Sequence, residues 1–257
     1  MATSTPPPVL ARGLGKSFKS VVALQDVSLT VEDRQFVTIV GPSGCGKSTL
    51  LRLISGLIPP TSGEVLVRGK KVTAPITDVG MVFQSPVLMP WRNTLENILF
   101  VAEMRGESAG KYRSRALELI ELAGLSGFEA RRPHELSGGM QQRVAICRAL
   151  LLNPPLILMD EPFGALDVIT RERMGFELEK IWNVTKTTVI FVTHSISESV
   201  LLSDSIIVMS ARPGRIVQTF KVDLPRPRGR ELLSHPAFVR LSADVRACIE
   251  DASVAQL

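Results

Sequence analysis

Short, continuous apolar runs recur along the 257-residue chain and determine where strands are predicted. Strands covered on both faces need apolar residues at nearly every position, which is typical of parallel sheets. Stretches with helical spacing lie between several of these runs, which favours an α/β sheet with helices on both faces. The five runs are Phe36–Val40, Val79–Phe83, Leu156–Met159, Thr188–Val192 and Ile206–Met209.

Two further segments alternate apolar and polar residues instead of presenting an unbroken apolar run. These segments are Leu24–Val31 and Glu64–Arg68. Alternation with a period of two residues predicts strands that turn one face toward water. We therefore expect a smaller antiparallel sheet in addition to the main sheet.

The pattern becomes helical between the second and third apolar runs. Apolar residues recur at helical spacing in Arg113–Leu122, and Thr94–Met104 and Met140–Leu152 also predict helices. We interpret residues 87–155 as a helical subdomain inserted into an α/β core that comprises 8–86 and 156–225. A Pro- and Arg-rich segment, Leu224–Arg230, then predicts a linker to a helical tail within 226–257.

The composition is that of an ordinary globular protein, with 45% apolar and 21% charged residues. The three cysteines are widely spaced, so they indicate neither a disulfide framework nor a metal site and favour a reducing cytosol. Residues 1–8 lack the regions of a signal peptide and predict a flexible, extended lead-in. The most apolar stretch, 145–159, contains Arg148, Asn153 and two prolines, so we expect no membrane span.

The net charge of +5 is accompanied by a group of arginines near the C-terminus. Such a group fits a nucleic acid, an anionic membrane surface or simply a solvated basic segment. No aromatic residues interleave with the arginines, so we expect no nucleic acid partner and favour the solvated segment. The arginines are Arg212, Arg215, Arg226, Arg228 and Arg230.

A glycine-rich loop follows the first apolar run and precedes a helical stretch. It matches the pattern G-x-x-x-x-G-K-[ST], in which backbone N–H groups and a helix N-terminus surround a phosphate. Lys47 is expected to reach the terminal phosphates, and the Ser48 hydroxyl is expected to bind Mg²⁺. The loop consists of Gly41, Pro42, Ser43, Gly44, Cys45, Gly46, Lys47, Ser48 and Thr49.

Two carboxylates come directly after the third apolar run. Ligands of open α/β sheets bind at the carboxyl ends of the strands, where Asp160 and Glu161 would lie. Asp160 suits an Mg²⁺-binding role, and Glu161 could orient or deprotonate an attacking water. A strand that merely ends in two acids is the alternative, but the phosphate loop upstream makes it the weaker one.

A third motif begins at Ser137, a favourable helix N-cap followed by Gly138 and Gly139. Exposed N–H groups at such a start could hold a second phosphate. The longer string is more specific: Leu-Ser-Gly-Gly-Met-Gln-Gln-Arg, then Asp-Glu-Pro, Gly-Ala-Leu-Asp and a later His. In the order and spacing of these motifs, residues 8–225 resemble the ATP-binding-cassette (ABC) ATPases.

The resemblance implies a P-loop NTPase core of the RecA-like type, with a small antiparallel β-subdomain and an inserted α-helical subdomain. It also implies ATP and Mg²⁺ as ligands, with Ser48, Gln84 and Asp160 at the metal. Lys47, Gln84, Glu161 and His194 would be the catalytic residues. Phe18 would stack on adenine, although a core phenylalanine is an alternative for that position.

The same resemblance implies that two copies of the chain act together. Ser137, Gly138, Gly139 and Gln141 would contact ATP bound to the other copy, and Asp167 would connect the two sites. Hydrolysis would then require two chains to close on the nucleotide, and its completion would release them. Gly164 departs from the family, in which many members have serine, and this affects only local loop contacts.

The segment Ser85–Asn97 carries apolar residues of the exposed type, and Trp91 and Arg92 are typical interface residues. A loop packed within the helical subdomain is the alternative interpretation. The segment resembles the permease-contacting loop of importers, and residues 211–216 and 224–228 are similar to the nitrate/sulfonate/taurine branch. These similarities imply a separate membrane permease, an extracytoplasmic solute-binding protein and a peripheral location on the cytoplasmic face of the inner membrane. A soluble ATPase, a regulatory ATP-binding subunit and an importer of another nutrient are the alternatives.

Overall fold

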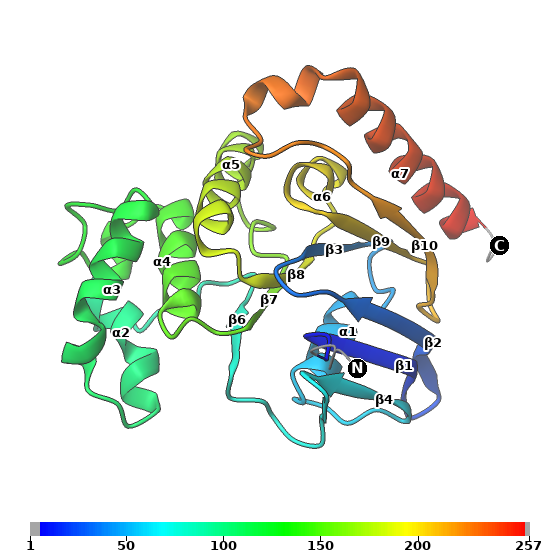
Figure 1. The fold of residues 1–257 in the computed structure, drawn as a ribbon, viewed down its shortest axis with the longest axis horizontal. Helices are drawn as coiled ribbons and strands as arrows, with labels where there is room; N and C mark the ends of the chain where they lie inside the picture. The colour runs from blue at the N-terminus through cyan, green and yellow to red at the C-terminus, as the bar shows by residue number, and fades with distance from the viewer. Residues whose placement is uncertain (1–5, 255–257) are drawn as a thin grey trace, which may run out of the picture.

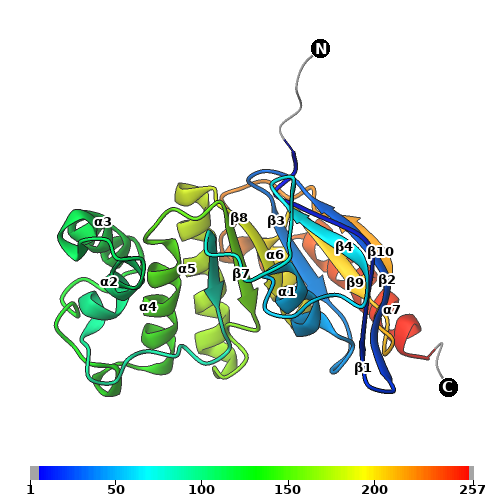
Figure 2. The same ribbon diagram turned by 90° about the horizontal axis from the view of Figure 1, so that it is seen from below.

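The computed structural model describes residues 6–254, so part of the expected lead-in, residues 1–5, lies outside the described residues. Two sheets and a group of helices form the fold (Figure 1). The helices of the inserted region lie at one end of the molecule and the smaller sheet lies at the other (Figures 1 and 2). The six-stranded sheet between them carries most of the residues expected at a nucleotide site.

The six-stranded sheet has the order β10-β9-β3-β8-β7-β6. All five predicted strands of this sheet are confirmed, and they pair in parallel. The antiparallel edge strand β10 was not predicted, because its exposed, mixed sequence lacks an apolar run. The strands are β3 (Phe36–Val40), β6 (Val79–Val82), β7 (Leu156–Asp160), β8 (Thr188–Val192), β9 (Ser205–Met209) and β10 (Ile216–Lys221).

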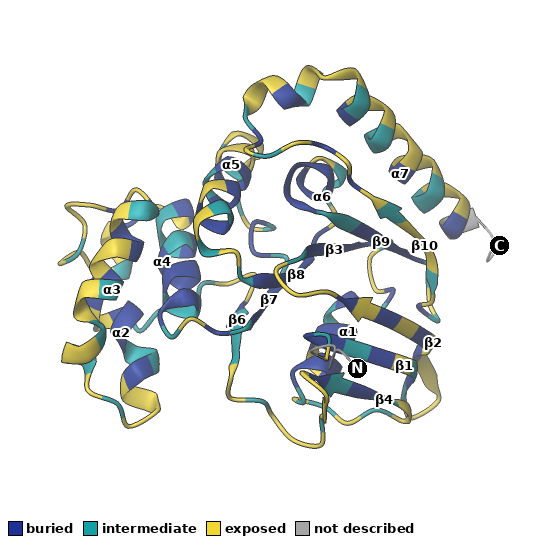
Figure 3. Ribbon diagram, in the orientation of Figure 1, coloured by how far each residue is buried: buried dark blue, intermediate teal, exposed yellow. Residues whose placement is uncertain are grey.

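Both faces of this sheet are covered, and every residue of β3 and β8 is buried (Figure 3). One face packs against α1 (Lys47–Ile54) and the smaller sheet. The opposite face packs against α5 (Val168–Thr185), α6 (Ile196–Leu202) and α7 (Pro236–Val254). Successive residues of a strand point to opposite faces, which is why these strands read as continuous apolar runs.

The smaller sheet is antiparallel and has the order β2-β1-β4-β5. The predicted alternation corresponds to β2 (Val21–Val31) and β4 (Ser62–Val67), with β5 (Lys70–Lys71) at the edge. The central strand β1 (Val9–Phe18) was not predicted. Its pairing with β2 is irregular from Ala11 onward, and the glycines there interrupt the alternating pattern.

The inserted region contains α2 (Thr94–Met104), α3 (Ala109–Leu122) and α4 (Gly138–Leu150), with a short 3-10 turn, η1 (Pro133–Glu135), before α4. Asn93 and Glu96 form a capping box, each side chain accepting a backbone N–H of the other residue, and this sets the start of α2. Ser137 accepts the Met140 N–H at the start of α4. These caps explain why the helices begin where they do.

The segment 224–230, called here the C-terminal strap, is anchored to the core by the buried side chains of Leu224 and Arg228. Arg228 is buried and donates to the carbonyl oxygens of Val200, Leu201 and Ser203, and Arg226 pairs with Glu179. The expectation of a solvated basic segment is therefore wrong for these two arginines. The sequence pattern could not reveal carbonyl partners more than twenty residues away. A second 3-10 turn, η2 (Arg230–Ser234), follows the strap and leads into α7.

Within residues 6–254, no helix combines the length and the apolar character that crossing a membrane requires.

Candidate nucleotide site

The glycine-rich loop lies between β3 and α1, in the middle of the six-stranded sheet. Gly41, Gly44 and Gly46 all have positive φ angles, which side-chain-bearing residues rarely adopt. A Cβ on Gly41 would lie 2.6 Å from the Met209 carbonyl oxygen, so β9 leaves space only for glycine. No side chain caps the start of α1 at Gly46, so its first N–H groups remain available to an anion.

Lys47 places its ammonium group inside the loop. Its Nζ donates to the carbonyl oxygens of Gly41 and Pro42 at 2.9 and 3.0 Å, and the side chain is buried. Burial raises the pKa of the adjacent Cys45 thiol, which keeps that thiol neutral. The loop borders an open pocket of about 230 Å³ lined by Ser43, Gly44, Gly46, Lys47, Ser48, Thr49, Glu161 and Arg212.

Arg212 lines this pocket although the sequence analysis did not assign it there. It lies in the turn between β9 and β10, and its Nη2 donates to the Gly44 carbonyl oxygen at 3.1 Å. Gly214 holds the turn in place, because it exchanges backbone hydrogen bonds with Ala23 and Gln25 of β2. The only signal in the sequence was the arginine cluster, which does not reveal that the turn folds back onto the loop.

Ser48 and Asp160 meet at the carboxyl edge of the sheet. The Ser48 Oγ donates to Asp160 Oδ1 at 2.7 Å, although the residues come from different elements. Burial raises the pKa of Asp160, and the hydrogen bond from Ser48 opposes this shift. A hydroxyl and a carboxylate are ligands that Mg²⁺ accepts together with phosphate oxygens. Among the described residues, no cluster of three or more acidic, histidine or cysteine side chains could hold a metal alone.

Glu161 and His194 form a second pair on the same edge. The His194 Nδ1 lies 3.4 Å from Glu161 Oε2, and both side chains remain partly exposed. Glu161 has a φ of 46°, and its N–H donates to the Val192 carbonyl oxygen. The two adjacent carboxylates therefore have different partners, Ser48 for Asp160 and His194 for Glu161.

Gln84 and Asp167 lie on loops near this edge. Gln84 follows β6 and is exposed, and its Nε2 would lie 3.1 Å from a Cβ built on Gly164. The glycine therefore leaves space beside Gln84 that a serine would fill. Asp167 caps α5 by accepting the Thr170 N–H, and that contact lowers the pKa of its carboxyl.

The structure does not bring three further predicted groups into the pocket. Ser137 and Gly138 are exposed at the start of α4, and Gly139 is buried beside them. The Gln141 amide donates to the carbonyl oxygens of Pro133 and Leu136, within its own loop. Phe18 is 47% exposed at the end of β1, with the Lys16 Nζ above its ring. None of these residues is among those that line the pocket beside the glycine-rich loop.

Residues 85–93, called here the docking segment after the contact that the sequence predicts for them, border a groove of about 300 Å³ between β6, α2 and α4. Trp91 is 68% exposed. Arg92 instead pairs with Glu103 at 2.7 Å and covers the Phe100 ring, so it is held within the subdomain. Arg92 is therefore a poorer candidate for a partner contact than Trp91.

Side chains of α4 hold the chain at this groove. Arg148 donates to the carbonyl oxygens of Pro86 and Val87 at 2.9 and 2.8 Å. Gln142 donates to the Phe83 carbonyl oxygen at 3.0 Å. The helix that begins at Ser137 is therefore bonded directly to the docking segment.

Comparison with known proteins identifies the family. The family model described as ABC transporter matches residues 24–164. The chain belongs to the ABC transporter family. It is 44% identical over 236 residues to the taurine import ATP-binding protein TauB of Rhizobium johnstonii, and the match covers 90% of each chain. It is 52% identical over 210 residues to the uncharacterized ABC transporter ATP-binding protein MJ0412 of Methanocaldococcus jannaschii, covering 82% of this chain and 79% of that protein.

Solved structures agree with this assignment. The dimeric post-hydrolysis state of the ATP-binding cassette MJ0796, bound to ADP and Pi, is 36% identical and has a TM-score of 0.71. It matches 84% of this chain and 100% of its own. CbiO1 of Clostridium perfringens, part of the ABC transporter complex cbiONQ, has a TM-score of 0.78 at 23% identity and supports the fold alone. The predicted family, fold class and ATPase activity are thus confirmed.

Proposed function

We propose that this ABC ATPase works as one of a pair of identical subunits that power the uptake of a small sulfonate, such as taurine, through a separate membrane permease. The main support for ATP hydrolysis at this site is that two pairs of side chains lie close to one loop. Ser48 with Asp160, and Glu161 with His194, both lie at the strand edge that bears the glycine-rich loop.

The residues at the carboxyl edge of the six-stranded sheet would have different roles in ATP hydrolysis. Lys47 and the loop N–H groups would bind the β- and γ-phosphates and stabilise the charge that develops on the γ-phosphoryl oxygens. Glu161 would accept a proton from the attacking water or orient it, and His194 would hold Glu161 and contact the terminal phosphate. Ser48 and Asp160, with Gln84 nearby, would hold Mg²⁺, which supplies charge neutralisation at the phosphates when bound.

A second copy of the chain would complete the site. Ser137–Gly139 are outside the pocket of their own chain, and Ser137 and Gly138 are exposed, so they are free to contact a nucleotide on the partner copy. Asp167 is also exposed, and the apolar residues after it, Val168 and Ile169, are 77% and 79% exposed. Such neighbouring apolar residues at a helix start are suited to burial against another protein. The dimeric state of the related MJ0796 cassette supports this arrangement.

The transport partners follow from the docking segment and from the relatives. The groove lined by Val87 and Met89 of the docking segment is open and largely apolar, so it could receive a short helix of a permease. The taurine import proteins of several bacteria match most of this chain, which supports a sulfonate as the solute. An extracytoplasmic solute-binding protein would deliver that solute, and this chain would act on the cytoplasmic face of the membrane.

The test of the catalytic assignment is Glu161→Gln, which keeps the size of the side chain but removes its basicity. Turnover should fall by about 10²–10⁴-fold, the usual contribution of a general base. ATP binding should persist, and the nucleotide-loaded variant should remain dimeric on size-exclusion chromatography. Glu172→Gln, an exposed charge change on α5, is the control and should hydrolyse ATP at the parent rate. A Glu161→Gln variant that keeps the parent rate would exclude this role.

A further inference from the structure

A buried carboxylate lies directly behind the loop that carries His194. Glu198, in the first turn of α6, is only 6% exposed. Its Oε2 accepts the Thr193 hydroxyl at 2.6 Å, and its N–H donates to the Ser195 Oγ at 3.3 Å. The Ser195 N–H in turn donates to the Thr193 Oγ at 3.0 Å. Both neighbours of His194 are therefore fixed by Glu198.

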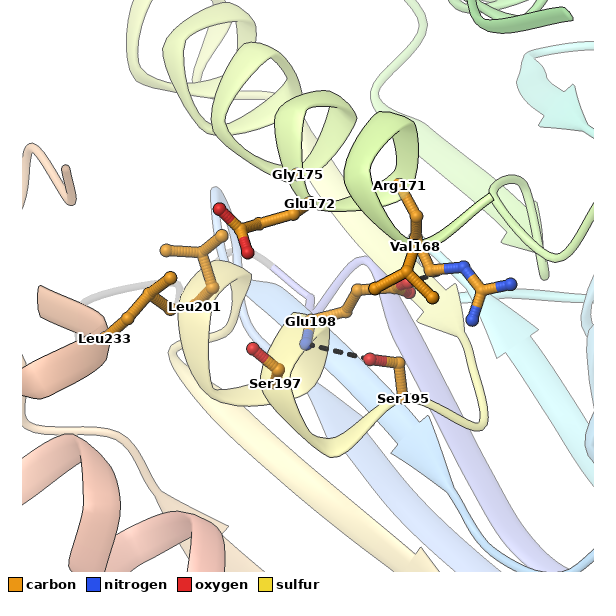
Figure 4. Close-up of a pocket in the computed structure, with 9 residues that line it drawn as sticks. All are labelled: Val168, Arg171, Glu172, Gly175, Ser195, Ser197, Glu198, Leu201 and Leu233. Atoms are coloured by element: carbon orange, nitrogen blue, oxygen red, sulfur yellow. Dashed lines mark hydrogen bonds and ion pairs between the residues drawn. The ribbon is translucent and has the colours of Figure 1, made fainter. Parts of the chain in front are cut away.

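Arg171 of α5 approaches the same carboxylate from the other side. Its Nη2 donates to the carbonyl oxygens of Gly164 and Leu166 at 3.4 and 3.0 Å, in the loop that leads to Asp167. Its Nε lies 3.9 Å from Glu198 Oε1. Figure 4 shows the Glu198 side chain of α6 reaching toward Arg171 of α5, whose terminal nitrogens point away from Glu198. Both residues line a cavity of about 150 Å³.

The contact between Arg171 and Glu198 is incomplete. Arg171 Nε is buried and has no hydrogen-bond partner among the described residues. Charge-assisted N–H···O bonds are about 2.7–2.9 Å long, so the gap is roughly 1 Å too wide for a bond. A buried donor without a partner costs free energy, which favours any movement that closes the gap. The adjacent cavity gives the side chain room to make that movement.

We propose that Arg171 and Glu198 are positioning residues that couple the loop 164–167 to the loop 193–195. Pressure from a partner copy on Asp167 would bring Arg171 onto Glu198, and Glu198 would then hold Thr193 and Ser195 so that His194 faces Glu161. Contact with the second copy would thus change the position of His194 relative to Glu161 within the same chain. This inference rests on the proposed function, since it requires the paired, hydrolysing state.

The variants Arg171→Gln and Glu198→Gln test the coupling, and Glu172→Gln on the same helix is the matched control. Each test variant should lower kcat about tenfold or more, because misplaced catalytic groups are costly, while the Kd for ATP measured by calorimetry changes less than about twofold. The double variant should be no slower than the slower single variant, because residues of one path are not additive. Asp167→Ala should likewise mask the effect of Arg171→Gln.

A second readout needs no nucleotide. Hydrogen exchange of the amides in 193–199 should become faster in Arg171→Gln, although that substitution lies on α5, and should not change in Glu172→Gln. Three results would each contradict the coupling. The test variants could keep the parent kcat, they could lose kcat and ATP affinity in parallel, or the losses of the single variants could multiply in the double variant. If the parent chain does not hydrolyse ATP, the proposed function is wrong. The coupling is tested separately by hydrogen exchange: if Arg171→Gln speeds the exchange of amides in 164–171 but not in 193–199, the two loops are not coupled.

Discussion

At the residue scale, most residues of the nucleotide site could be predicted from the sequence, but Arg212 could not. The expectation that Asp160 and Glu161 lie at a strand end follows from the apolar run before them, because carboxyl ends of parallel strands share an edge. The contact of Ser48 with Asp160 is consistent with that expectation. Arg212 was missed because its contact with Gly44 joins residues 168 positions apart, through a turn with no periodic signal.

Arg212 should strengthen nucleotide binding. Its guanidinium lines the pocket beside Lys47, so Arg212→Ala removes a cation that would face the phosphates. Because Arg212 is exposed and screened by salt, we expect a modest loss, about threefold in ATP affinity at low salt and less at high salt. Calorimetric titration with ATP at two salt concentrations measures this loss.

Arg215 of the same turn provides the matched control. It pairs with Gln25 on β2 and does not line the pocket, so Arg215→Ala should leave ATP affinity unchanged. Equal affinities of the Arg212 and Arg215 variants at low salt would show that Arg212 contributes no attraction to the phosphates.

At the element scale, predictability followed the strength of the periodic pattern. The helix Thr94–Met104 was predicted with its observed bounds, and the structure shows a capping box at its start. β1 and β10 were missed for two reasons: bulges interrupt the alternation of β1, and β10 is an exposed edge strand with few apolar residues. The C-terminal strap resembled a linker because proline and arginine are common in linkers, and only its tertiary contacts show otherwise.

Arg228 should make a large contribution to stability through the strap. Burial lowers its pKa to about 10, but its guanidinium still supplies donors to the carbonyl oxygens at the end of α6. Arg228→Met would leave those carbonyl oxygens buried without donors, so we expect a loss of about 3 kcal/mol in the free energy of unfolding. Urea denaturation followed by circular dichroism measures the change.

Arg230 is the control for this substitution, since it is exposed and only approaches the Phe176 ring. Arg230→Met should cost less than about 1 kcal/mol. Equal unfolding midpoints for the two variants would mean that the strap does not stabilise the core.

At the scale of the whole molecule, the order of the motifs was sufficient to predict the family and the fold class, because each motif has a fixed place in the topology. The pairing of two copies rests on a different kind of observation. Ser137 and Gly138 are exposed and do not line the pocket of their own chain, which is why we propose that a second copy completes the nucleotide site. No pattern within one chain specifies the geometry of that assembly.

Trp91 should contribute to permease binding rather than to hydrolysis. It is exposed in the docking segment, two residues after Met89 of the groove lining, and it does not line the phosphate pocket. Trp91→Ala should leave the ATPase rate of the isolated chain near the parent value and weaken permease binding by about 2 kcal/mol, roughly 30-fold, as expected of an interface hot spot. Binding to detergent-solubilised permease by surface plasmon resonance measures the change.

Val184→Ala removes an equally exposed apolar side chain from the far end of α5 and should leave permease binding unchanged. If the Trp91 and Val184 variants bind the permease equally well, the docking segment is not the site of contact.

The hydrogen bonds from α4 to the docking segment connect that segment mechanically to the other end of the helix. Arg148 holds the carbonyl oxygens of Pro86 and Val87, and Ser137 lies eleven residues before it, about 16 Å away at 1.5 Å per residue. A displacement of the docking segment would therefore be transmitted along α4 to the turn at Ser137. The docking segment and the turn at Ser137 would therefore move together, because one rigid helix joins them.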